Sequence, residues 1–334
     1  MTNDRPLLGI TMGDPAGVGS EVIVKAYPEV VSFADVVVIG DADVVREAVG
    51  ICGVDLDVRA VDDVAAVEPS ADAITVLDLD NVADLEYGAL REEYGEASLE
   101  YVARAIELAT SGDVDAIVTA PINKQATRMA GSEYAGHTGM LADYTDTENY
   151  SMMLIEGDLR VTHVSTHVPL REACDLVTTE RVLSTIEVTD EALRSLGIDD
   201  PTLAVAGLNP HASDGGLLGD EDDAEIRPAV RAARDRGLDV HGPESPDTVY
   251  VQAAAGRYDC VVSMYHDQGH IPVKMLGFRG DGAVSGVNVT IGLPIVRTSV
   301  DHGTAFDIAG EGVASAVSMV DACRVAASAT ATRE

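Results

Sequence analysis

Three of the eight histidines in the chain lie at the ends of short apolar runs that are typical of buried strands. They are His167, His211 and His266, and Asp247 and Asp267 lie close enough in sequence to orient them or to join them. Neutral imidazole is the commonest metal ligand, and three protein ligands that leave positions open are typical of a catalytic metal centre. We therefore predict that these histidines hold one divalent metal ion. The alternative is that each forms only hydrogen bonds in a loop.

A second set of side chains suits an anion. Lys274, Asn288 and Arg297 lie within one stretch, and the tripeptide HTG at 137–139 is a further candidate. Lys124, like Lys274, stands beside a strand-end motif in a chain that has only three lysines. Because Lys and Arg bind carboxylate and phosphate groups, this set predicts a doubly anionic substrate. Ordinary surface charge is the alternative for each residue.

The segment GDPAGVGSE at 13–21 contains three glycines directly after an apolar run. It fits neither the G-x-G-x-x-G dinucleotide fingerprint nor the P-loop, which ends in Lys followed by Ser or Thr. The segment predicts a tight turn that follows a strand at 7–12 and opens a helix, whose N-terminus can receive an anion.

Short β-branched runs alternate with helical patterns along the chain. Residues 96–112 form one predicted helix, because apolar residues recur at helical spacing and Gly112 follows where a helix ends. Similar patterns occur at 178–197 and 223–237. This alternation predicts an α/β fold with a largely parallel sheet. The predicted strands are 7–12, 36–40, 73–79, 115–121, 151–156, 161–166, 203–211, 260–267 and 295–300.

Polar side chains gather where these strands end. Asn123 and Lys124 follow one strand, Asn209 and His211 close a second, and His266 closes a third. In open α/β sheets, ligands bind at the carboxyl ends of the strands. We therefore expect these groups to converge on one cleft.

The length and the charge of the chain limit the classes of function. A chain of 334 residues is long for one core, so two subdomains are expected. Asp and Glu number 57 against 22 basic residues, which gives a formal net charge of −35 and repels nucleic acid and anionic membranes. We interpret this as a halophile-type surface, because the Debye length falls to about 3 Å near 1 M salt. An acidic protein of a mesophile is the alternative.

The sequence also favours a cytoplasmic protein. No apolar run reaches the length of about 18 residues that a transmembrane helix needs, and the first residues lack the pattern of a signal peptide. The four cysteines lie far apart, and their spacing fits neither a zinc site nor a disulfide framework. Reduced, buried thiols are therefore expected.

Eight motifs follow one another over nearly the whole chain. They are ITMGDPAGVGSE (10–21), VTAPINK (118–124), GHT (136–138), THVPL (166–170), LNPHASDGG (208–216), PDTVY (246–250), MYHDQGHIPVK (264–274) and GVNVTIGLPIVRTSVDHGTAFDIAG (286–310). Together they resemble the 4-hydroxythreonine-4-phosphate dehydrogenase family. The resemblance implies the fold of the isocitrate and isopropylmalate dehydrogenases, NAD as the cofactor, and a homodimer with sites near the subunit interface. On this basis we expect a first α/β subdomain of 1–125 plus 286–334, on the cofactor side, and a second of 126–285, on the metal and dimer side.

The resemblance also implies roles for single residues. The histidines that match the metal-binding histidines of the family are His167, His211 and His266. The matching substrate-binding residues are His137, Thr138, Lys274, Asn288 and Arg297. The segment 301–310 is similar to the loop that receives the adenosine end of the cofactor in isopropylmalate dehydrogenases, and it makes cofactor-binding candidates of His302, Gly303 and Asp307.

Two departures from the biosynthetic members of the family point to one branch. Those members usually have GHTE where this chain has HTG at 137–139, and their segment from the lysine to GVN is shorter than 274–288. The present sequence looks more like the branch that oxidises D-threonate or D-erythronate 4-phosphate to dihydroxyacetone phosphate. Oxidation of 4-phosphohydroxy-L-threonine, for pyridoxal phosphate biosynthesis, is the alternative.

The implied reaction is oxidation at C3 followed by loss of the carboxylate as CO2, with the metal polarising the new carbonyl. The metal is Zn, Co, Mn or Mg, among which imidazole ligands alone do not choose. The expected base at the C3 hydroxyl is Asp247, Lys124 or a metal-bound water. Alternatives from other classes are an NAD-independent metal hydrolase or aldolase and a two-lobed solute-binding protein.

Overall fold

The computed structural model describes residues 5–134, 136–277 and 286–331. The chain forms two compact units. The first unit comprises Met1–Asp146, Ala283–Val287 and Leu293–Glu334, and the second comprises Thr147–Gly282 and Asn288–Gly292. Each unit is thus assembled from separate parts of the sequence.

The first unit is built on a parallel sheet with the strand order β3-β4-β2-β1-β5-β12. Its central strands are continuous apolar runs, as expected for parallel strands that helices cover on both faces. Leu8, Ile39, Ile74 and Ile117 are at most 1% exposed, and burial of each such side chain contributes about 1.5–3 kcal/mol. The strands are β1 (Leu7–Thr11), β2 (Asp35–Gly40), β3 (Asp57–Val61), β4 (Ala73–Asp78), β5 (Ala116–Thr119) and β12 (Val296–Val300).

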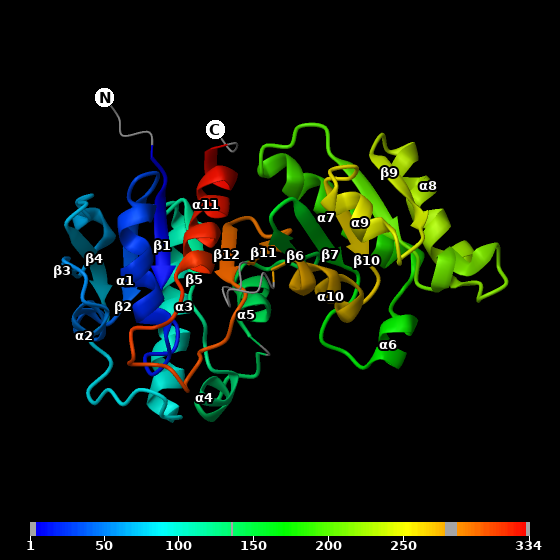
Figure 1. The fold of residues 1–334 in the computed structure, drawn as a ribbon. Coiled ribbons are helices and arrows are strands. Elements are labelled where there is room, and N and C mark those ends of the chain that lie inside the picture. The colour runs from blue at the N-terminus through cyan, green and yellow to red at the C-terminus, as the bar shows by residue number, and fades with distance from the viewer. Residues whose placement is uncertain (1–4, 135, 278–285, 332–334) are drawn as a thin grey trace. The chain divides into compact units, whose positions relative to one another are not determined.

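Helices pack on this sheet, as Figure 1 shows. Helix α1 contacts α2 and α11, while α3 packs on β1, β2 and β5. Tyr94 and Tyr101 of α3 are buried, and Gly112 ends this helix in the left-handed conformation, as predicted. The helices of this unit are α1 (Gly19–Val30), α2 (Ala42–Cys52), α3 (Glu92–Ser111), α4 (Lys124–Met129), α5 (His137–Tyr144), α11 (Val317–Ala331) and the short 3-10 helix η1 (Val64–Ala66).

The second unit has the strand order β11-β6-β7-β10-β8-β9. Strands β6 and β7 are antiparallel to each other, while β7, β10, β8 and β9 are mutually parallel. Leu154, Val161, Val261 and Tyr250 belong to the core that covers one face of these strands. The strands are β6 (Ser151–Glu156), β7 (Leu159–His163), β8 (Thr202–Ala206), β9 (Asp239–Glu244), β10 (Cys260–Ser263) and β11 (Val287–Ile291, of which Val287 is assigned to the first unit).

The helices of the second unit connect these strands (Figure 1). They are α6 (Leu170–Asp175), α7 (Thr179–Ser195), α8 (Arg227–Asp235), α9 (Val249–Ala254), α10 (His266–Gly277), the 3-10 turn η2 (Pro210–Asp214) and the π-helical turn η3 (Asp222–Ile226). Within the described ranges, no helix combines the length and the apolar character that crossing a membrane requires.

The predicted α/β class is confirmed, and every predicted strand is present. The strands that the sequence analysis missed are β3, β9 and β11. Strands β3 and β9 are the outer strands of their sheets, so they carry more exposed and polar residues and lack a continuous apolar run. Part of the long segment after Lys274, residues 278–285, lies outside the described residues.

Asn288–Gly292 lie in the second unit, whereas they were predicted to belong to the first subdomain, and residues 126–146 lie in the first unit, whereas they were predicted to belong to the second. The packing of α3 on α4 accounts for this position, because a Cβ atom added at Gly95 of α3 would lie 2.1 Å from the carbonyl oxygen of Ala126. The helix α5, which carries His137 and Thr138, therefore belongs to the first unit.

Candidate active site

Three of the predicted substrate-binding or catalytic residues come together in the first unit. Lys124 is the first residue of α4, His137 is the first residue of α5, and Arg297 lies on β12 beside β5. Burial holds the pKa of His137 well below its usual range, and the nearby charges of Arg297 and Lys124 lower it further. His137 is therefore a neutral imidazole near two cations. We call Lys124, His137 and Arg297 the cationic corner.

Arg297 is held in this corner by a threonine hydroxyl. Its Nη2 donates a hydrogen bond to Oγ1 of Thr119 at 2.6 Å, and the two residues are 2% and 0% exposed. In the parallel pair of β5 and β12, Arg297 lies beside Ile117, two residues before Thr119, so both side chains point to the same face of the sheet. Burial lowers the pKa of Arg297 to about 9, which leaves the guanidinium charged at neutral pH.

Helix starts position the other members of the corner. The Asn123 side chain accepts hydrogen bonds from the backbone N–H groups of Gln125 and Ala126, which fixes the start of α4 at Lys124. The Nε2 atom of His137 is shielded from solvent and has no hydrogen-bond partner among the described residues. Thr138 follows His137 in α5. Two cations, an imidazole and a hydroxyl are suited to a dianionic group.

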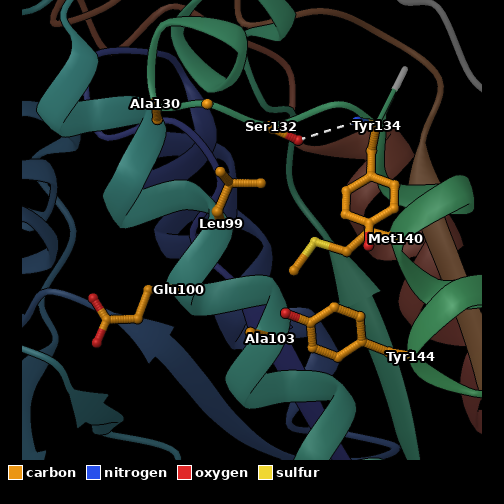
Figure 2. Close-up of a pocket in the computed structure, with 9 residues that line it drawn as sticks. Leu99, Glu100, Ala103, Ala130, Ser132, Tyr134, Met140 and Tyr144 are labelled. Carbon is orange, nitrogen blue, oxygen red and sulfur yellow. Dashed lines mark hydrogen bonds between the residues drawn. The ribbon is translucent and has the colours of Figure 1, made fainter.

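Figure 2 shows a pocket of the same unit, of about 330 Å³, on the side of α3 that faces α5. The side chains of Tyr134, Met140 and Tyr144 border it. None of its lining residues is cationic, and Glu100 is acidic, so it does not suit an anionic substrate. The lining residues are Leu99, Glu100, Ala103, Ala130, Gly131, Ser132, Tyr134, Met140 and Tyr144.

The predicted cofactor-binding residues follow β12 in the first unit. The Nδ1 atom of His302 lies 3.0 Å from the carbonyl oxygen of Gly303. Gly303 and Asp307 are exposed, and a Cβ atom added at Gly303 would meet no other atom within 4 Å. Space for a ligand is therefore open at this point of the loop.

Two of the three predicted metal-binding histidines lie together in the second unit, in a group of four that we call the histidine cluster. His266 begins α10, and its ring centroid lies 5.4 Å from that of His167. His270, one turn further along α10, stacks on His266 with a centroid distance of 3.6 Å and an angle of 12°. The ring centroid of His163, the last residue of β7, lies 4.8 Å from that of His270.

The neighbours of His266 fix its orientation. Its Nδ1 atom lies 2.8 Å from Oδ1 of Asp267, which favours the tautomer with the proton on Nδ1 and leaves Nε2 to accept or to coordinate. His270 is held in turn, because its Nδ1 lies 3.0 Å from the carbonyl oxygen of His266. Burial lowers the pKa of His163 to about 3, so this member of the cluster is neutral.

The third predicted ligand, His211, lies in a strained turn. His211, Ala212, Ser213 and Asp214 all have positive φ angles, from 44° to 66°. Such conformations cost about 1–3 kcal/mol each unless the surroundings impose them. The buried carboxylate of Asp222 does so, because it accepts hydrogen bonds from the backbone N–H groups of Leu208 and Asn209 and from the hydroxyl of Ser213.

The donor set fits a divalent metal in its chemistry. His167 and His266 supply adjacent imidazoles, and Asp247 is near enough to His211 for the histidine to lower its pKa, although the hydroxyl of Ser245 is the larger cause. Within the described part of the chain, however, no three His, Cys, Asp or Glu side chains converge closely enough to hold an ion as they stand. The assignment of His211 as the third ligand therefore stays a prediction.

The remaining predicted substrate-binding residues lie in the second unit. Lys274 is on α10, two turns after His266, and is half-buried. Asn288 is on β11, and its Nδ2 lies 3.1 Å from the sulfur of Met152. The predicted binding residues thus form two sets, one with the cationic corner and one with the histidine cluster.

Sequence reasoning missed three residues that support these sets. Thr119 lies inside the VTAPINK motif, and its spacing from the strand end could have identified it. His270 follows His266 at helical spacing, which was also visible. Asp222 lies in an acidic run, 220–223, where nothing local distinguishes it from a solvated side chain.

Comparisons with known proteins agree on one family. Residues 32–326 match the model of the family described as pyridoxal phosphate biosynthetic protein PdxA. A relative from Clostridium botulinum (strain Hall), provisionally named D-threonate 4-phosphate dehydrogenase, is 46% identical over 331 residues, which cover 98% of each chain. A relative from Salmonella typhi with the same provisional name is 47% identical over 324 residues, which cover 96% of this chain and 97% of its own. The crystal structure of a 4-hydroxythreonine-4-phosphate dehydrogenase from Klebsiella pneumoniae covers 98% of this chain and 100% of its own, with 43% identity and a TM-score of 0.87.

Proposed function

The chain belongs to the PdxA family and is a dehydrogenase, and on this premise we propose that it oxidises and decarboxylates a phosphorylated four-carbon hydroxy acid, with NAD and a divalent metal ion. The favoured substrate is D-threonate or D-erythronate 4-phosphate, and the product is dihydroxyacetone phosphate. The observation that carries the proposal is the cationic corner, in which Thr119 holds the buried Arg297, and the Nε2 of His137 lacks a hydrogen-bond partner among the described residues. The provisional names of relatives that are 46% and 47% identical support the choice of substrate.

The residues of the cationic corner would bind and orient the substrate. Arg297 is charged and fixed by Thr119, so it can offer the paired N–H groups that a phosphate or carboxylate accepts. His137 is neutral, and its Nε2 is available to a hydroxyl or an anionic oxygen. Lys274, Asn288 and Thr138 are the other residues that we propose to bind the substrate. Such positioning of C3 is the main contribution of binding groups to the rate.

The metal would be held by His167, His211 and His266, with Asp267 fixing the ring of His266. When bound, it supplies Lewis-acid polarisation of the C3 oxygen. Its identity among Zn, Co, Mn and Mg is left to experiment. The cofactor segment would comprise His302, Gly303 and Asp307.

Lys124 is the better placed of the two candidate bases. It lies in the cationic corner beside His137, whereas Asp247 is exposed, bonded to the hydroxyl of Ser245 and next to His211. Because Lys124 binds an anion as a protonated amine, it can accept the proton of the C3 hydroxyl only after it has released its own. We propose that Lys124 acts as the base in this unprotonated form and that Asp247 orients His211. The proposal also includes a homodimer and a cytoplasmic enzyme, which is consistent with the four free cysteines.

A spectrophotometric assay of NADH formation tests the reaction. The purified protein is given D-threonate 4-phosphate, D-erythronate 4-phosphate or 4-phosphohydroxy-L-threonine, each with NAD and with Zn, Co, Mn or Mg at high and low KCl. We expect turnover of the first or second substrate that a chelator abolishes. Turnover of the amino substrate alone would favour pyridoxal phosphate biosynthesis. Release of phosphate or cleavage without NAD would indicate a hydrolase or aldolase and would contradict the proposal.

The metal ligands have their own test. His211→Ala is expected to abolish metal-dependent NADH formation and to weaken metal binding measured by calorimetry, while the circular dichroism spectrum stays that of the wild type. His241→Ala is the matched control, because this histidine of β9 contacts Asp239 and Tyr258 instead. Normal turnover in His211→Ala would refute the ligand assignment.

A further inference from the structure

Two charged residues of α1 hold the backbone that follows the predicted cofactor segment. Glu21 is fully buried, and each of its carboxylate oxygens accepts one backbone N–H group. Oε1 accepts from Gly310 at 2.6 Å, and Oε2 accepts from Gly312 at 2.7 Å. A single side chain thus satisfies two donors of a loop that lies almost 290 residues away in sequence.

Lys25, one turn further along α1, binds the carbonyl groups of the same loop. Its Nζ donates to the carbonyl oxygen of Gly312 at 2.8 Å and to that of Ala314 at 2.6 Å. Glu21 and Lys25 therefore make four hydrogen bonds to residues 310–314. All four involve a charged side chain, and such bonds are shorter and stronger than neutral ones.

The loop has the glycines that this arrangement needs. Gly310 and Gly312 have φ angles of +85° and +68°, a region that other residues rarely adopt. A Cβ atom at Gly310 would lie 2.9 Å from the ring of Tyr87, and one at Gly312 would lie 2.9 Å from the carbonyl oxygen of Ile51. The glycine pair turns two alternate N–H groups toward the same carboxylate.

The turn that precedes α1 holds the loop at a second point. The N–H group of Val18 donates to the carbonyl oxygen of Thr304 at 3.0 Å. A Cβ atom at Gly17 would lie 3.0 Å from that oxygen, so glycine allows the approach without displacing the loop. The segment GDPAGVGSE and the helix it opens therefore hold the loop at Thr304 and at residues 310–314, while Gly303 and Asp307 stay exposed.

We propose that Glu21 and Lys25, together with the Gly17–Val18 turn, form a clamp that pre-orders residues 302–312 for the adenosine end of a dinucleotide. This inference rests on the proposed function. It assigns to Glu21 and Lys25 the role of positioning residues, which act on the cofactor through the loop. Pre-ordering raises affinity because the loop loses less conformational freedom on binding.

Glu21→Gln is the direct test. The variant keeps the shape of the side chain but replaces one accepting oxygen with an amide group, so one of the two backbone N–H groups loses its acceptor. We expect the KM for NAD and the Kd for NADH, measured by fluorescence, to rise about tenfold, which corresponds to the loss of one hydrogen bond to a charged group. We expect kcat and the KM for the phosphorylated substrate to stay within about twofold. Hydrogen exchange of the Gly310 and Gly312 amides should accelerate, while exchange in β1 stays unchanged.

Glu29→Gln on the same helix is the control, because Glu29 forms an exposed ion pair with Arg324 and does not contact the loop. Lys25→Met is a second variant, in case Glu21→Gln does not fold, and it should raise the KM for NAD in the same direction. Faster exchange throughout the first unit with normal NADH affinity would show a purely structural role and overturn the clamp. Faster hydrogen exchange in the loop alone, without a change in NADH affinity, would also overturn the clamp.

The clamp and the proposed function fail in different experiments. If the wild-type protein neither binds NADH nor reduces NAD with any candidate substrate, both the proposed function and the role of the clamp in cofactor binding are refuted. A wild-type protein that uses NAD, together with a Glu21→Gln variant of normal KM, overturns the clamp alone.

Discussion

The removal of the Thr119 hydroxyl gives a sharp test of the cationic corner. Thr119→Val preserves the volume of the side chain and removes the acceptor of the Arg297 hydrogen bond. Because the two residues are 0% and 2% exposed, water has little access to replace the lost partner. A hydrogen bond to a charged group contributes about 1.5–3 kcal/mol, so we expect the free energy of unfolding to fall by that amount.

The same change should weaken substrate binding. A guanidinium that Thr119 no longer aligns can adopt several orientations. It must lose this conformational freedom when it binds the anionic group of the substrate, and binding becomes weaker. A loss of about 1.4 kcal/mol corresponds to a tenfold rise in KM for the phosphorylated substrate, while the KM for NAD should be unaffected. Thr119→Ser, which retains the hydroxyl, should restore the KM.

Thr298→Val is a closely matched control. Thr298 is also 0% exposed and is the neighbour of Arg297 on β12, but its hydroxyl donates to the carbonyl oxygen of Ala322, at 2.9 Å, on the opposite face. Urea unfolding and steady-state kinetics of both variants separate stability from binding. If both lose similar stability and neither changes the KM of the substrate, the role of Thr119 in binding is refuted.

Two further predictions concern pH and salt. Burial raises the pKa of Asp14 from 3.8 to about 6, against a smaller lowering effect of the Ala16 N–H group. The folded protein therefore retains a proton that the unfolded chain releases, and stability falls as the pH rises through this window. Asp14→Asn should add roughly 3 kcal/mol to the free energy of unfolding at pH 7 and almost nothing near pH 3, and an equal effect at both values in urea unfolding would contradict this reasoning. The net charge of −35 predicts a melting temperature that rises between about 0.1 and 3 M KCl, and a constant value would exclude the halophile interpretation.

The sequence predicted the residues that lie at strand ends, because the geometry of a parallel sheet determines where they go. Lys124 begins the helix that comes after β5, and Arg297 lies on the adjacent strand β12, so their meeting in one unit follows from the strand order. The strand order itself was not predictable, since the pairing of β5 with β12 joins segments 180 residues apart. Thr119 gained its role only through this pairing.

The position of His211 shows a different limit of prediction from sequence. Its place after an apolar run was visible, but the positive φ angles of 211–214 were not, because none of these four residues is glycine. The conformation depends on Asp222 at the start of η3, whose carboxylate accepts hydrogen bonds from Leu208 and Ser213. The residues next to Asp222 in the sequence form no pattern that predicts these bonds. The boundary between the units after Asp146 was not predictable either, because it also depends on a contact between separate elements, the packing of α4 on Gly95 of α3.

The contact between His266 and Asp267 yields a last prediction, which concerns metal affinity. The solvent exposure of Asp267 determines how much the affinity should change. Removal of a carboxylate that forms a hydrogen bond to a metal-binding histidine typically lowers metal affinity by about 10–100-fold. Asp267 is 73% exposed, so water screens its charge and competes for its oxygen, and the effect should lie at the lower end. We expect Asp267→Asn to weaken metal binding about tenfold by calorimetry, because the amide retains an acceptor oxygen but not the charge. Asp239→Asn, which changes the partner of His241, is the control. If both variants bind the metal as the wild type does, Asp267 does not orient His266, and the stacking of His270 remains as the contact that does so.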